Sequence, residues 1–112
     1  DYGRHEHKNL RIKMNINVQF VDTRKIASVE ELVNEKLTQL EAKYDFITNA
    51  AVFLKEEKHE GDRSHVCEVR LSVPGPQLFA SSNETFFEKA VARTFEDLQK
   101  QLQKYKEKIQ RH

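Results

Sequence analysis

Several residue types are scarce in this 112-residue chain, and each scarcity excludes a class of structure or site. A single cysteine, Cys67, cannot form a disulfide within the chain, and no spacing of cysteine and histidine resembles a zinc site. The fold therefore has to depend on its hydrophobic core, in which we expect Cys67 to be buried. No apolar run approaches the ~18 residues of a membrane-spanning helix, and no stretch reads as a signal peptide. We expect a soluble, cytoplasmic protein with no membrane partner.

Patterns typical of catalysis are also missing. The chain has only three glycines, none of them in a phosphate-binding loop, and it has no H-E-x-x-H motif or nucleophile–base arrangement. Carboxylates gather at Glu56, Glu57, Glu60 and Asp62, but such a run in a polar segment is typical of solvated charge. His65 is interpreted as a surface histidine. The sequence therefore predicts no enzyme, no cofactor, no metal and no small-molecule substrate.

Charge is present in both signs, and it is segregated along the chain. With 38% hydrophobic and 33% charged residues, the chain suits one domain with a modest core, and its net charge is only +1. Residues 98–112 nevertheless carry a net +4, whereas residues 84–97 carry −2. Acidic residues at a helix start and basic ones at its end complement the helix dipole. That effect explains one or two cations in a last turn, so we favour a binding role for the others.

The first thirteen residues show no sustained hydrophobic period. We interpret residues 1–13 as a flexible leader or added sequence, and residues 14–112 as one α/β domain. Two histidines in this leader, His5 and His7, are not expected to form a metal site.

Hydrophobic periodicity predicts the elements that follow. From residue 15 the residues alternate as in a half-buried strand, with Ile16, Val18 and Phe20 on one face. Ser28 and Glu31 have the S-x-x-E form of a capping box, which predicts that a helix begins there and extends to about residue 44. Strands are expected at residues 50–57, 67–73 and 77–81, with a polar loop at 57–64 and a tight turn at Pro74 and Gly75.

The last predicted helix covers residues 83–109, with Ser82 and Asn83 as its cap. At roughly 100° per residue, one side of it is apolar and the opposite side is basic. The apolar side is formed by Phe87, Val91, Phe95, Leu98, Leu102, Tyr105 and Ile109. The basic side is formed by Lys89, Arg93, Lys100, Lys104, Lys108 and Arg111. The helix is therefore expected to bury one side in the core and to present cations on the other.

The element order β-α-β-β-β-α predicts an α+β fold, a two-layer sandwich. A crossover helix makes the first two strands parallel, and the next three strands form an antiparallel meander, so the four-stranded sheet is mixed. Both helices should cover one face. Phe53 and Phe79 are then expected on the open face, as a cross-strand contact or, less favoured, a docking patch.

Six stretches in this order carry a family resemblance. They are N-I-N-V-Q-F at 15–20, V-E-E-L-V-N-E-K-L-T-Q-L-E-A-K-Y-D at 29–45, A-A-V-F-L-K-E-E at 50–57, V-R-L-S-V-P-G-P-Q-L-F-A at 69–80, F-E-K-A-V at 87–91 and D-L-Q-K-Q-L-Q-K-Y-K-E-K at 97–108. The chain resembles the ribosome hibernation-promoting factors, also called ribosome-associated inhibitors or sigma-54 modulation protein-like proteins. Longer members add a second domain that pairs ribosomes, so this chain is interpreted as a short form or a truncated one.

The resemblance implies both fold and function. The family's fold is this same sandwich, similar to double-stranded RNA-binding domains. Its members bind the small ribosomal subunit near the decoding centre and in the mRNA channel, where they block mRNA and tRNA sterically under stress or in stationary phase. The partners expected are therefore the small subunit and its rRNA, with ribosome dimerisation possible and the free protein a monomer. The RNA-binding residues implied are Lys36, Lys43, Lys89, Arg93, Lys100, Lys104, Lys106 and Lys108.

Two other functions remain open from the residues alone. One is a small α/β protein-interaction module, and the other is a general double-stranded RNA-binding domain. Many family members carry a basic residue where this chain has Gln39, Asp97 and Gln103, so its cationic surface is expected to be thinner than theirs.

Overall fold

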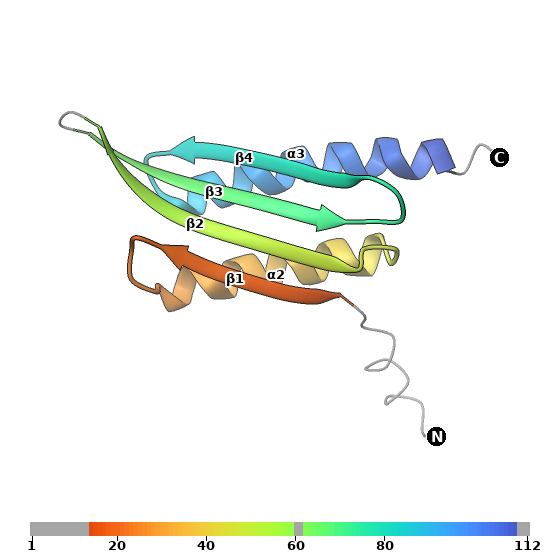
Figure 1. Ribbon diagram of the computed structural model, residues 1–112, viewed down its shortest axis with the longest axis horizontal. Helices are drawn as coiled ribbons and strands as arrows, with labels where there is room; N and C mark the ends of the chain where they lie inside the picture. Colours follow the sequence, from red (N-terminus) through yellow and green to blue (C-terminus); the bar gives the residue numbers. More distant parts are fainter. Residues whose placement is uncertain (1–13, 60–61, 110–112) are drawn as a thin grey trace, which may run out of the picture.

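The computed structural model describes residues 14–59 and 62–109, which form a four-stranded sheet and two helices (Figure 1). The elements are β1 (Asn15–Val21), α2 (Ala27–Lys43), β2 (Asn49–His59), β3 (Asp62–Ser72), β4 (Gln77–Glu84) and α3 (Phe87–Ile109). The predicted α+β fold and element order are confirmed. The leader predicted at residues 1–13 and the side chain of Arg111 lie outside the described residues.

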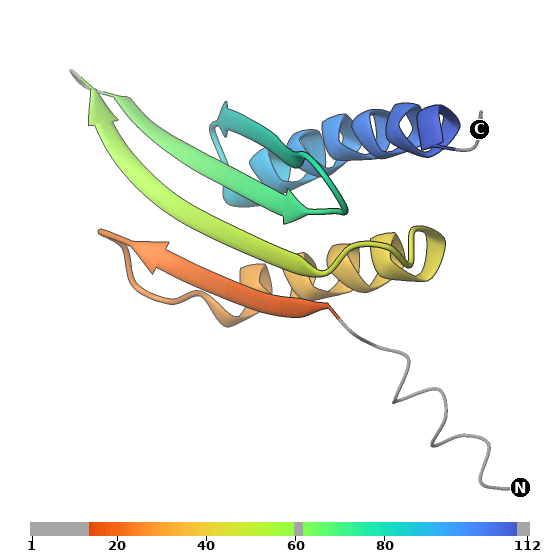
Figure 2. The same cartoon turned by 45° about the vertical axis from the view of Figure 1, so that its right-hand side comes forward.

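The sheet has the order β1-β2-β3-β4, with β1 parallel to β2 and the other neighbours antiparallel. Both helices cover the same face of it, as the two views in Figures 1 and 2 show. Val52 on β2 lies opposite Val18 on β1 and opposite Val69 on β3, and Val69 lies opposite Ala80 on β4. These apolar rows form the floor on which the helices pack.

The core lies between the sheet and the predicted apolar stripes of the helices. Leu37 on α2 and Leu98 on α3 are fully buried. Cys67 is buried as expected, and burial raises the pKa of its thiol to about 12. The hydroxyl of Thr94 on α3 lies 2.8 Å from the Ala90 carbonyl oxygen and 3.2 Å from that of Cys67. A buried polar group thus has partners both in its own helix and on the sheet.

The topology makes the two helices run in the same direction. α2 returns antiparallel to β1 and β2, and α3 returns antiparallel to β4, which itself runs parallel to β2. The amino-terminal ends of both helices therefore lie at one end of the molecule and the carboxyl-terminal ends at the other (Figure 1). The hairpin of β2 and β3 projects at the amino-terminal end (Figure 2).

Both predicted helix starts were wrong, because apolar contacts and strand pairing prevail over polar capping. α2 begins at Ala27, one residue before Ser28, and Ile26 occupies the cap position without a side-chain hydrogen bond. Ile26 packs against the core and accepts hydrogen bonds from Val29 and Glu30 through its carbonyl. α3 begins at Phe87, since the residues predicted as its cap continue β4 and pair with β3 as far as Glu84.

The predicted loop at residues 57–64 was also wrong for the part of it that the structure describes. β2 continues to His59 and β3 resumes at Asp62, opposite it. Glu57 and Lys58 are exposed on this ribbon, which extends beyond the helices (Figure 1). Neither helix covers this segment, so its residues are polar, and a polar segment is also the signal that a loop gives.

Phe53 and Phe79 do not form the expected contact across neighbouring strands. They lie on β2 and β4, which β3 separates. Phe79 lies opposite Arg70, whose guanidinium is 5.8 Å from the centre of the ring. This geometry is a cation–π contact, so Phe79, the more exposed of the two aromatic residues, already has a partner on β3.

Candidate nucleic-acid interface

Charge in the helix layer is polarised along the helices. α3 carries six lysine and arginine residues against four acidic residues, whereas α2 carries two lysines against four glutamates. Most of the excess positive charge lies in the second half of α3, and the glutamates of α2 are concentrated in its first half. Because the helices are parallel, the basic halves share one end of the molecule. The helix layer therefore has a basic end, formed by the second halves of both helices, and an acidic end, formed by the first half of α2.

At the basic end, one lysine from each helix lies near the ring of Tyr44. Lys43 on α2 and Lys106 on α3 both place their Nζ atoms near the ring of Tyr44, at 5.8 and 5.9 Å from its centre. Tyr44 itself is buried, and Gln103 and Glu107 line the same hollow. Two cations from different helices are thus brought to one small region that the sequence separates by more than sixty residues.

Lys100 and Lys104 occupy the outer surface of α3. They border a shallow hollow with Asp97, Gln103 and Glu107. Asp97 is engaged by the amide of Gln101 at 3.4 Å, and that amide also donates to the carbonyl of Phe79 at 2.9 Å. The acidic residue that interrupts the basic stripe is therefore held beside β4 by a glutamine.

Six of the eight predicted RNA-binding cations have no ion pair within 4 Å among residues 14–59 and 62–109. These six are Lys36, Lys43, Lys100, Lys104, Lys106 and Lys108. A lysine without an intramolecular partner can neutralise an external phosphate without first breaking a contact.

Lys89 and Arg93 differ from the other six, because both are paired with Glu84 at the end of β4. Arg93 Nη1 lies 3.0 Å from Glu84 Oε2, and Lys89 Nζ lies 3.7 Å from Oε1. No sequence pattern indicates this arrangement, because the predicted helix includes residues 83 and 84, which lie on β4. Placing Glu84 on a strand is what brings its carboxylate under the first turns of α3.

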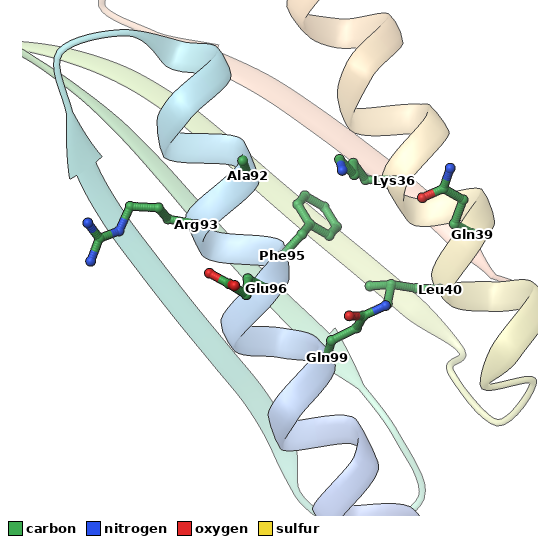
Figure 3. Close-up of a pocket in the computed structure, with 8 residues that line it drawn as sticks. All are labelled: Lys36, Gln39, Leu40, Ala92, Arg93, Phe95, Glu96 and Gln99. Atoms are coloured by element: carbon green, nitrogen blue, oxygen red, sulfur yellow. The ribbon is translucent and has the colours of Figure 1, made fainter.

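A groove of about 280 Å³ separates α2 from α3. The residues that line it are Lys36, Gln39 and Leu40 from α2 and Ala92, Arg93, Phe95, Glu96 and Gln99 from α3 (Figure 3). Lys36 is directed toward α3, and Arg93 also lines the groove, with its guanidinium turned away from α2 (Figure 3). The predicted cations therefore border different hollows: Lys36 and Arg93 border this groove, Lys43 and Lys106 border the hollow at Tyr44, and Lys100 and Lys104 border the hollow beside Asp97.

Tyr105 closes the core at the basic end. Its hydroxyl donates a hydrogen bond to the carbonyl of Pro74, and its ring centre is 5.2 Å from that of Phe46. This placement agrees with the position of Tyr105 on the predicted apolar side of the helix, where it packs against the core. The hydrogen bond also ties the end of α3 to the turn between β3 and β4, where Gly75 adopts a positive φ of 102°.

The interpretation of His65 as a surface histidine was wrong. Its side chain is 20% exposed, its ring packs edge-on against Phe87 at 4.7 Å, and its Nε2 lies 3.3 Å from Glu56. Nδ1 of His65 is buried and has no hydrogen-bond partner within residues 14–59 and 62–109. Among the described residues, no cluster of three or more histidine, cysteine or acidic side chains could hold a metal, and no helix is long and apolar enough to cross a membrane.

The sequence is similar to those of proteins named ribosome hibernation promoting factor. A ribosome hibernation promoting factor of Pseudomonas putida is 31% identical over 99 residues, which are 88% of this chain and 91% of the relative. The factor of the same name in Escherichia coli K12 is 28% identical over 99 residues and is covered completely.

Solved structures share the fold. A ribosomal subunit interface protein from Coxiella burnetii superposes with a TM-score of 0.73 at 22% identity, over 83% of this chain and 98% of that one. The N-terminal domain of Thermus thermophilus Protein Y superposes with a TM-score of 0.70 at 19% identity, over 82% of this chain and 99% of that one. Residues 16–110 match the profile of the family described as "Sigma 54 modulation protein / S30EA ribosomal protein". The chain belongs to this family of ribosome-associated proteins.

Proposed function

We propose that this protein is a ribosome hibernation factor that binds the small ribosomal subunit near the decoding centre, in the mRNA channel. Bound there, it excludes mRNA and tRNA by occupying their space, so its action is steric and involves no catalysis. Its partner is the small subunit with its rRNA, and it acts in the cytoplasm under stress or in stationary phase. Family membership and the names of the relatives support the role, and the charges of the helix layer support the mode of binding.

The observation that carries the proposal is the gathering, at one end of two parallel helices, of lysines that have no ion pair among the described residues. Lys43 and Lys106 meet at Tyr44, and Lys100, Lys104 and Lys108 extend along the second half of α3. Folded rRNA presents closely spaced phosphates, and lysines that displace its counter-ions give affinity without reading the sequence. We infer that the basic end faces the RNA and that the acidic first half of α2 faces away from it.

Competition on purified small subunits tests the location. Labelled protein is bound to the subunits, and a leadered mRNA with initiator tRNA is then titrated in. A protein in the mRNA channel is displaced in proportion to mRNA occupancy, whereas a protein bound on the outer surface of the subunit remains. A fluorescein attached at Lys58, on the exposed ribbon of β2, keeps the label away from the basic end.

The same assay separates the alternative functions. An excess of free RNA duplex should not displace the protein from subunits if it recognises the folded channel. Displacement by the duplex at equal phosphate concentration would favour a general double-stranded RNA binder. Binding that persists unchanged at high salt would favour a protein-interaction module, because contacts to phosphate weaken steeply with salt.

A further inference from the structure

Glu84 lies largely buried beside two exposed cations. It is the last residue of β4 and lies opposite His65 in the register of β3 and β4. Its side chain is only 15% exposed, whereas those of Lys89 and Arg93 are 60% and 63% exposed. The carboxylate is therefore the anchored member of the cluster, and the two cations reach down to it from the first turns of α3.

The neighbours of Glu84 leave its carboxylate to these two cations. His65, the residue opposite it on β3, is already paired through Nε2 with Glu56 at 3.3 Å, and the His65 ring is held against Phe87. Glu84 instead uses both of its oxygens on α3, with Oε2 at 3.0 Å from Arg93 and Oε1 at 3.7 Å from Lys89. Hydrogen bonds between charged groups are stronger than neutral ones, and arginine is well suited to carboxylates and phosphates alike.

A phosphate that approaches Lys89 or Arg93 meets this carboxylate as a competitor. The cation has to leave Glu84 to bind the phosphate in the same geometry, or the phosphate has to bind beside an uncompensated negative charge. Neither cost arises at Lys100 or Lys104, which have no ion pair within the described part of the chain. The first half of α3 should thus contribute less to RNA binding than its number of cations suggests.

We propose that Glu84 is an internal counter-ion that competes with RNA phosphate for Lys89 and Arg93, and so limits both the affinity and the salt dependence of RNA binding. This inference rests on the proposed binding of rRNA. It assigns a role in binding to a strand residue that does not itself contact RNA.

The test compares the unchanged chain with four variants: Glu84→Gln, Glu88→Gln, Arg93→Ala and the Glu84→Gln/Arg93→Ala double variant. Glu88 is the matched control, because it lies in the first turn of α3, is exposed and has no ion pair within 4 Å in the described residues. Its substitution changes net charge by the same amount without releasing a cation. Affinity for small subunits is measured from 50 to 300 mM KCl, and each variant is also titrated with long-chain inorganic polyphosphate.

If Glu84 competes with phosphate, Glu84→Gln binds several-fold more tightly than Glu88→Gln. Its plot of log affinity against log salt also steepens by about 0.7–0.9 for each cation released. Arg93→Ala then costs more affinity in the Glu84→Gln background than in the unchanged chain. A purely structural role for Glu84 would not steepen the salt dependence.

Identical salt slopes for Glu84→Gln and Glu88→Gln, with an equal cost of Arg93→Ala in both backgrounds, overturn the inference. Failure of the unchanged chain to bind subunits rejects the proposed function, and the polyphosphate titration then still decides the role of Glu84. Should Glu84→Gln fail to fold, Lys89→Ala/Arg93→Ala is compared with Lys100→Ala/Lys104→Ala in the unchanged background. A smaller loss for the first pair supports competition, and an equal loss contradicts it.

Discussion

Reversing two charges on the outer surface of α3 should weaken ribosome binding in a salt-dependent way. The perturbation is Lys100→Glu with Lys104→Glu, two exposed residues without an ion pair in the described residues. Unit charges 4 Å apart in water interact by ~1 kcal/mol, so each reversal removes an attraction and adds a repulsion of that size. The two reversals together cost about 4 kcal/mol at low salt, roughly a thousandfold in affinity. With a Debye length of about 8 Å at physiological ionic strength, part of this cost is screened there.

The assay is co-sedimentation with small subunits over a series of KCl concentrations. Loss of two phosphate contacts should make the slope of log affinity against log salt shallower by roughly 1.5. The matched control is Arg24→Glu with Lys58→Glu, which changes net charge equally at exposed positions outside the basic end. The free energy of unfolding of both double variants should lie within about 0.5 kcal/mol of that of the unchanged chain, since surface substitutions seldom cost more. An equal loss of affinity in both double variants would refute binding through a localised basic end, because net charge alone would then explain the affinity.

Three further predictions concern the core that holds α3 in place. Leu98→Ala removes a fully buried side chain and should lower the free energy of unfolding by about 2–5 kcal/mol, measured by urea denaturation; a loss below about 1 kcal/mol would show that the site collapses. Thr94→Val removes the hydroxyl shared between the Ala90 and Cys67 carbonyls and should cost about 1 kcal/mol; an unchanged stability would show that neither bond contributes. Burial raises the pKa of the Cys67 thiol to about 12, so between pH 9 and 12 the unfolded thiol loses its proton while the native one keeps it. The free energy of unfolding should therefore fall by up to about 1.4 kcal/mol per pH unit in that window relative to Cys67→Ala, and a parallel pH dependence of the two proteins would contradict it.

The periodic parts of the chain allowed its architecture to be predicted, and the element boundaries were not predictable for identifiable reasons. Val18 and Phe20 on β1 and the apolar stripe of α3 pack on the core, so the hydrophobic period indicated the buried face there, whereas Ile16 at the start of β1 is 42% exposed. Helix starts depend instead on competition between local caps and distant contacts. Ile26 prevailed over Ser28 because it packs on the core, and pairing with β3 kept β4 extended to Glu84.

The candidate site was predictable in its composition but not in its grouping. Segregation of lysines toward the end of the chain was evident in the sequence, and so was the interruption by Asp97. The sequence did not reveal that Lys43 and Lys106 share the ring of Tyr44, because that contact depends on the relative placement of two helices. The pairing of Arg93 with Glu84 was hidden by a boundary error of only a few residues.

The parallel arrangement of the helices has an electrostatic consequence at the basic end. Each helix carries about half a negative charge at its carboxyl terminus, so two parallel helices present roughly one negative charge there. In an antiparallel pair these partial charges would be at opposite ends, and so would the lysines of each last turn. Lys43, Lys106 and Lys108 first offset the two helix ends, and Glu107 cancels a further charge. About one positive charge of these three lysines then remains, and Lys100 and Lys104 supply about two thirds of the surplus available to an RNA phosphate. Their reversal should therefore weaken binding more than the reversal of any other pair at the basic end.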